Sequence, residues 1–164
     1  MKLSITSRRG LLTVHILFAA IMFGNMVTFL ILSIVAATTE NVQLIESCYQ
    51  IMHVLASTSV KASTIGTTVT GILLSICTKW GFFQFYWIIA KQIITVMLIG
   101  FNLWGMYAWT LDALNLLKTT GDQTDMFMLQ IDLWIGIIIQ IISLVFIFTI
   151  SVFKPWGRRK KQKD

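Results

Sequence analysis

A nearly unbroken apolar run from Trp80 to Asp112 limits what this chain can fold into more than any other feature. A run of about thirty apolar residues is long enough to cross a lipid bilayer as a helix and too long for the core helix of a soluble domain. Lys91 lies inside this run. An ammonium group in such a helix is costly, so it either extends to the membrane surface or faces a protein interior that uses it.

The composition of the whole chain also indicates a membrane protein. Of its 164 residues, 56% are hydrophobic and 12% are charged, and the mean hydropathy is +0.78. A chain of this length has room for about four membrane helices with short loops, and none for a separate soluble catalytic domain. We therefore predict an all-α integral membrane protein, folded as an up-down bundle of four transmembrane helices.

The apolar segments set the expected spans of that bundle. They cover residues 11–37, 45–78, 81–111 and 129–153, and the second is expected to cross the membrane over about 61–78. The first run is about twice as long as the hydrophobic part of a signal peptide, so a retained helix is favoured over a cleaved signal.

Basic residues gather where the chain begins and ends. Residues 1–10 form a basic arm, residues 154–164 form a basic tail, and Lys79 lies in the second connection, whereas the outer connections hold only Lys118. The positive-inside rule then places both termini in the cytoplasm. Short basic arms and compact loops suit a bacterial inner membrane. We interpret the net charge of +6 as topology signals and contacts with anionic lipid headgroups, not as a nucleic-acid interface.

Motifs for several common redox centres are missing from the sequence. Cys48 and Cys77 lie near opposite ends of the second segment, so the sequence offers neither a disulfide framework nor a metal-binding pair of close cysteines. No glycine-rich fingerprint for flavin or NAD occurs. Any chemistry must come from the helices and their ends.

Each predicted helix gathers its polar residues on one face, because they recur at helical spacing. Two interpretations are open: close helix packing with hydroxyl groups bonded to neighbouring helices, or the wall of a polar cavity. Lys61 and Asp132 are both expected toward the outer side and form a candidate ion pair. The residues expected in the polar interior are His53, Lys61, Thr95, Asn102, Asp132 and Gln140.

His15 and Lys91 are the residues with the clearest chemical potential. Both enter from the cytoplasmic side, at depths of about 9 Å and 18 Å at the helical rise of 1.5 Å per residue. A tilt of the helices or the long lysine stem could bring them together. His53 enters from the opposite side, too far from His15 for both to bind one haem iron.

Two methionines extend the face of His15 along the first helix. Met22 and Met26 lie about two and three turns beyond His15, and Asn25 is close by. Methionines in membrane helices usually fill space, but thioethers also bind haem iron and Cu(I). We therefore include His15, Met22, Met26 and Asn25 as candidate cofactor-binding residues.

Two motifs give the chain a family resemblance. The first helix reads His15-Ile-Leu-Phe-Ala-Ala-Ile-Met-Phe-Gly24, and the third reads Trp87-Ile-Ile-Ala-Lys91-Gln-Ile-Ile-Thr-Val-Met-Leu-Ile-Gly100. Together they resemble the HemJ-type membrane protoporphyrinogen oxidases and the related CopD-like four-helix membrane proteins. The resemblance implies a bound haem b, with His15 as ligand of the haem iron and Lys91 as its catalytic partner.

The chain is nearer to the uncharacterised members of that superfamily than to the HemJ type. After Gly24 it reads Asn-Met-Val-Thr-Phe-Leu, where the HemJ type carries an aromatic residue, a proline and an arginine. The Lys-Pro-Trp-Gly sequence that begins at Lys154 also fits the uncharacterised relatives better.

Three functional hypotheses follow. The first is a haem-b redox protein related to protoporphyrinogen oxidase, in which Lys91 orients a propionate or moves a proton and a membrane partner takes the electrons. An enzyme of this kind would be a HemJ-like oxidoreductase. The second is a small transporter or metal-handling component, with His15, Met22 and Met26 along its path. The third is a non-enzymatic accessory subunit, whose polar faces pair with other membrane proteins or with a second copy.

Overall fold

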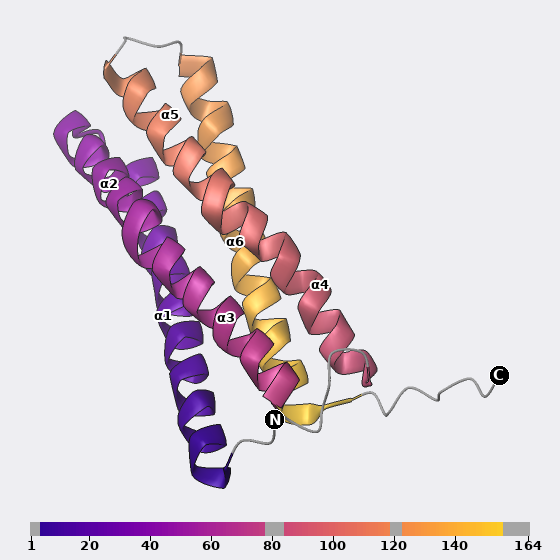
Figure 1. Ribbon diagram of the computed structural model, residues 1–164. Coiled ribbons are helices and arrows are strands. Elements are labelled where there is room, and N and C mark those ends of the chain that lie inside the picture. The colour runs from indigo at the N-terminus through magenta and orange to yellow at the C-terminus, as the bar shows by residue number, and fades with distance from the viewer. Residues whose placement is uncertain (1–3, 78–83, 119–122, 156–164) are drawn as a thin grey trace.

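The computed structural model describes residues 4–77, 84–118 and 123–155. These parts are almost entirely helical, which confirms the all-α prediction. Four long helices alternate in direction and lie side by side (Figure 1). Their segments are α1 (Ile5–Thr38); α2 (Val42–Leu55), η1 (Ala56–Val60) and α3 (Lys61–Cys77); α4 (Tyr86–Gly100), η2 (Phe101–Gly105) and α5 (Met106–Lys118); and α6 (Gln123–Phe153).

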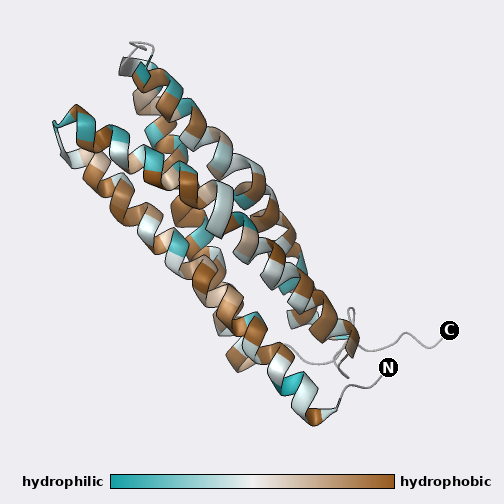
Figure 2. Cartoon of the chain, turned by 60° about the vertical axis from the view of Figure 1, so that its left-hand side comes forward, coloured by the Kyte–Doolittle hydropathy of each residue, from teal (hydrophilic) through white to brown (hydrophobic). Residues whose placement is uncertain are grey.

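All four helices are long and apolar enough to cross a membrane, as predicted. Hydrophobic residues run along each of them, with hydrophilic positions between (Figure 2). Many large apolar side chains face outward, among them Ile16, Leu17, Ile93 and Ile142. A lipid-facing surface needs such an exterior, because the bilayer core offers polar groups no partner.

The first helix begins earlier than predicted. Ser4 caps α1, and its side chain accepts a hydrogen bond from the backbone N–H of Ser7 at 3.1 Å. Arg8 and Arg9 therefore belong to the first turns of the helix and not to a separate arm. At the other end of the chain, Lys154 adopts a left-handed backbone with φ of 46° where α6 stops. The basic residues at 79 and 158–163 lie outside the described residues.

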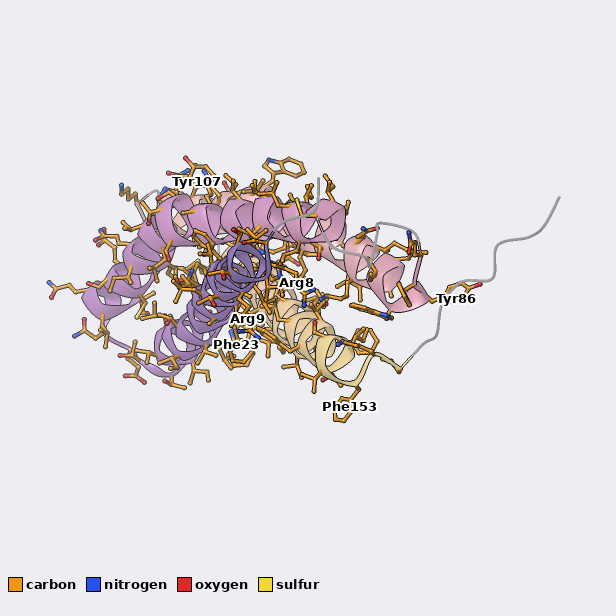
Figure 3. All side chains as sticks on the ribbon, turned by 60° about the horizontal axis from the view of Figure 1, so that its bottom comes forward. Arg8, Arg9, Phe23, Tyr86, Tyr107 and Phe153 are labelled. Carbon is orange, nitrogen blue, oxygen red and sulfur yellow. The ribbon has the colours of Figure 1, made fainter. Side chains whose placement is uncertain are left out.

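The bundle has two chemically different ends. The start of α1 and the end of α6 lie together, so Arg8, Arg9 and Lys154 share what we call the basic end (Figure 1). Figure 3 looks at this end, with Tyr86 and Phe153 extending away from the bundle. The opposite end, where α1 stops and α6 begins, is called the far end.

Two π-helical segments, η1 and η2, interrupt the second and third long helices and contact each other. Both lie within runs of buried residues that recur at every fourth position. An α-helix has 3.6 residues per turn, so strict four-residue spacing drifts by about 40° at each step. One wider π turn takes up the excess and returns the buried face to the core. The two runs are Cys48, Met52, Ala56, Val60 and Thr64, and Leu98, Asn102, Met106 and Thr110.

Glycines let the helices approach closely. A Cβ at Gly66 would lie 2.7 Å from the ring of Phe18, and one at Gly71 would lie 3.3 Å from the ring of His15, so α1 and α3 are in direct contact. Elsewhere, α1 meets α6 through the edge-to-face rings of Phe23 and Phe148, whose centroids are 6.3 Å apart.

Candidate functional site

His15 is held by a threonine of the neighbouring helix. Its Nδ1 lies 2.9 Å from Oγ1 of Thr70. We assign the single hydroxyl proton of Thr70 to the nearer of two carbonyl oxygens, that of Gly66 at 2.6 Å. Thr70 therefore accepts the bond from His15, and in the neutral ring Nδ1 carries the proton while Nε2 keeps its lone pair.

His53 has the same arrangement in the other half of the bundle. Its Nδ1 lies 3.2 Å from Oγ1 of Thr110, and that hydroxyl donates to the carbonyl of Met106 at 2.8 Å. Nδ1 of His53 is therefore the donor as well. Thr70 and His53 lie on one long helix, and the residues between them span about 25 Å. The structure does not bring His15 and His53 together.

The ammonium group of Lys61 lies over the Tyr107 ring, which neighbours His53. The Nζ atom of Lys61 lies 4.1 Å from the centroid of the Tyr107 ring, and that ring lies 4.8 Å from the ring of His53. The ammonium is stabilised by the face of the aromatic ring. The side chain of Lys61 thus has its partner on α5 rather than on α6, where the sequence suggested an ion pair.

Asp132 is not part of the interior, contrary to the prediction. Its side chain is exposed and lines a hollow of about 450 Å³ at the far end, together with Asp112 and Asp125. An exposed carboxylate stays hydrated and needs no buried partner, which explains why Asp132 does not pair with Lys61.

Lys91 lies nearer to the basic end than His15, the reverse of the predicted order. The described part of its helix begins at Tyr86, which puts Lys91 about one and a half turns inside, against about three turns for His15. Its Nζ donates to Oγ of Ser151 at 2.7 Å and lies 5.7 Å from the Trp87 ring. No hydrogen bond joins Lys91 to His15, whose partner is Thr70.

A layer of hydrogen-bonding side chains crosses the middle of the bundle. Sδ of Met22 accepts from Oγ1 of Thr64 at 3.7 Å and from Nδ2 of Asn102 at 3.8 Å. Counting eleven residues inward from the Lys91–Ser151 contact along each antiparallel helix reaches Asn102 and Gln140, so we place these two residues at about the same depth. These residues, one from each long helix, form what we call the central layer: Met22, Thr64, Asn102 and Gln140.

Two amides of the central layer keep unused hydrogen-bonding atoms. Asn102 is 1% exposed and Gln140 is 0% exposed. Within the described part of the chain, Oδ1 of Asn102 and both Oε1 and Nε2 of Gln140 have no partner. A buried amide without partners is destabilising by about 1–3 kcal/mol for each group left unpaired. The sequence pointed to both residues by their place on the polar faces.

The other candidate residues lie apart from His15. Asn25 exchanges hydrogen bonds with Ser59, at 3.0 Å from Nδ2 and 3.1 Å to Oδ1. Met26 is fully buried in the hydrophobic core, and Thr95 is half-buried on α4. The structure does not gather the four candidate cofactor residues into one site. His15 contacts Thr70, Met22 belongs to the central layer, and Asn25 and Met26 lie further along α1.

The residues that hold the histidines were not identified as partners from the sequence. Thr70 and Thr110 form hydrogen bonds with histidines more than fifty positions away in the sequence. Ser151 likewise accepts a hydrogen bond from the distant Lys91. Single-helix spacing carries no signal for such contacts, since they depend on how the helices are aligned.

Comparisons with known proteins add no relative. No protein-family model, no curated protein and no solved structure matches this chain. Among the residues that the structure describes, no group of three His, Cys, Asp or Glu side chains could hold a metal ion. The HemJ-type resemblance rests on the two motifs alone.

Proposed function

We propose that this chain is a multi-pass membrane transporter that conducts protons through its polar interior. The observation that carries the proposal is the matched pair of histidines, one on each side of the central layer. With the hydroxyl protons assigned to the backbone carbonyls, the Nδ1–H of each histidine donates a hydrogen bond to a threonine and Nε2 keeps a lone pair. Such an imidazole can accept a proton on one nitrogen and release the other, and intramembrane histidines commonly serve proton relays.

Polar groups continue between the two histidines. From the basic end, His15 is followed by Thr67, whose Oγ1 is buried and has no partner among the described residues. The central layer comes next, and the hydrogen-bonded pair Asn25 and Ser59 lies beyond it. His53 completes the series. This order gives a hydrogen-bonding group at roughly every one to two helical turns between the two histidines.

The packing of the centre favours a proton over a larger solute. Met26, Met106 and Ile137 lie about one turn from Met22, Asn102 and Gln140, on the far-end side of the central layer, and are fully buried. A molecule of metabolite size cannot pass such a closely packed section without separating the helices. A proton needs only a chain of hydrogen bonds.

The distribution of charge supports a direction in the membrane. Arg8 and Arg9 lie at the basic end with Lys154, while Asp112 and Asp125 are exposed at the far end. By the positive-inside rule the basic end faces the cytoplasm of a plasma membrane. The ammonium of Lys91 then lies at the cytoplasmic mouth, where it repels metal cations.

The proposal is tested with purified protein in liposomes that contain a pH-sensitive dye. A potassium gradient with valinomycin drives proton entry, and the expected result is faster acidification than in protein-free liposomes. His15→Gln and His53→Gln keep a hydrogen-bonding side chain but cannot carry a proton, so each should abolish the added flux. Thr28→Val, which changes an exposed hydroxyl, is the matched control. Equal acidification with and without the native protein contradicts the proposal.

A second candidate is haem b bound at His15. The specific observation is the bond from Nδ1 to Thr70, because metal-binding histidines usually donate their other ring N–H in this way. His15 would be the protein ligand and Lys91 would pair with a propionate, while haem would supply redox chemistry. Met22 and Met26 do not complete the site, since both lie in the packed centre.

The absorption spectrum of the detergent-purified protein tests this candidate. Oxidised and dithionite-reduced spectra should show a Soret band and reduced α and β bands that His15→Ala removes. A colourless protein, expressed with haem supplied, contradicts the candidate and leaves proton conduction untouched.

A further inference from the structure

The central layer interrupts the proposed route unless something joins its two sides. Amide side chains do not release or take up protons at ordinary pH, so Asn102 and Gln140 cannot themselves relay a proton. They do present two acceptors and one donor without partners among the described residues. The question is which ligand these three atoms would bind.

Charge limits the ligand to a neutral molecule. The central layer consists of two amides, one hydroxyl and one thioether, and none of them carries a charge. The nearest ammonium groups are engaged elsewhere, Lys61 on Tyr107 and Lys91 on Ser151. An ion in this layer would remain uncompensated in surroundings of low dielectric constant.

Size limits the ligand further. Gln140 is flanked one turn to each side by Ile137 and Leu144, which are buried in the same hydrophobic cluster as Met26 and Met106. Only a molecule of about one or two heavy atoms suits such packing. It must also donate and accept hydrogen bonds. Water has both properties, and buried water typically makes about three hydrogen bonds to groups that otherwise lack partners.

We propose that the central layer binds ordered water between α6 and η2. One molecule accepts from Nε2 of Gln140 and donates to Oδ1 of Asn102, and a second donates to Oε1 of Gln140. Two molecules are needed because Nε2 and Oε1 point to different sides of the same amide. The role of this water rests on the proposed function: it joins the His15 half of the route to the His53 half, since water passes protons along hydrogen bonds and amides do not.

Binding is tested independently of transport by solid-state NMR on the reconstituted native protein. Magnetisation is transferred from water to side chains, and the Gln140 amide signal is assigned by its loss in Gln140→Leu. We expect early transfer to Gln140 and Asn102, comparable to that of exposed Gln50, with buried Ile137 as the dry reference. Transfer to Gln140 as slow as to Ile137 overturns the proposal.

Transport supplies the second test. Gln140→Leu and Asn102→Leu should each stop the acidification of liposomes while His15 and His53 are intact, and circular dichroism checks that the variants remain helical. Gln140→Asn, which keeps an amide, should retain part of the flux and serves if the leucine variants do not fold. If the native protein and Gln140→Leu acidify the liposomes at the same rate above that of protein-free liposomes, the proposal is overturned. A native protein that does not conduct contradicts the proposed function alone, and the NMR result then decides the water site.

Discussion

Thr70 determines which nitrogen of His15 carries the proton. Its own hydroxyl proton goes to the carbonyl of Gly66, 2.6 Å away, so only its oxygen remains to face the imidazole at 2.9 Å. The same relationship between Thr110 and His53 recurs in the other half of the bundle. Two unrelated stretches of sequence thus build one chemical unit twice.

Removing the Thr70 hydroxyl should release the ring of His15. We expect Thr70→Val to lower the free energy of unfolding by about 1 kcal/mol, because a partly buried hydrogen bond is lost. Nitrogen chemical shifts of the imidazole should show a mixture of the two neutral tautomers in place of one. Thr28→Val, whose hydroxyl also bonds to a carbonyl one turn earlier but faces outward, should leave His15 unchanged. A single Nδ1–H tautomer in both variants would refute this assignment.

The contact between Gly136 and Trp109 should not tolerate a methyl group. A Cβ at Gly136 would lie 2.6 Å from the Trp109 ring, whereas one at Gly100 would meet nothing within 4 Å. We expect Gly136→Ala to destabilise the protein by about 1–3 kcal/mol through overpacking. Gly100→Ala should be neutral or slightly stabilising. Unfolding in sodium dodecyl sulfate, followed by circular dichroism, measures both, and equal stabilities would show that α5 and α6 do not meet there.

A double-mutant cycle distinguishes the observed partner of Lys61 from the one suggested by the sequence. Lys61→Met combined with Tyr107→Leu should give a coupling energy of about 0.5–2 kcal/mol, as expected for a cation over an aromatic ring. Lys61→Met combined with Asp132→Asn should be additive within about 0.5 kcal/mol. Coupling to Asp132 instead of Tyr107 would contradict the structure.

Deleting one residue from η2 should be tolerated better than deleting one from a regular helix. Trp104 is exposed within η2, and its removal lets the wide turn become α-helical while Met106 and Thr110 keep facing the core. Deletion of exposed Val145 from α6 rotates every later residue by about 100° and should unfold the bundle. Thermal unfolding compares the two deletions. Equal destabilisation by the two deletions would mean that the π turn in η2 does not accommodate the loss of a residue.

Helix number, class and outward apolar faces could be predicted from the sequence because they depend on local properties. Continuous hydrophobicity sets the four spans, and helical spacing identified Asn102 and Gln140 as interior residues. The two π segments were not predicted, although the regular four-residue spacing from Cys48 to Thr64 carries their signal. That spacing becomes informative only once the buried positions are known.

The arrangement around Lys91 and Lys61 could not be predicted because it depends on contacts between helices. The depth of Lys91 follows from where its helix begins, and the described helix begins at Tyr86, later than hydrophobicity alone suggested. The partner of Lys61 follows from which helix is adjacent to α3. Neither the depth of Lys91 nor the partner of Lys61 is determined by a residue pattern within one helix.

A helix with one wide turn need not keep that turn in a fixed place. The turn can migrate along the backbone one residue at a time, and each residue it passes is rotated by about 100° around the helix axis. Asn102 lies inside η2. Migration of the turn past this position would rotate the Asn102 side chain about the helix axis and so take its amide out of the central layer.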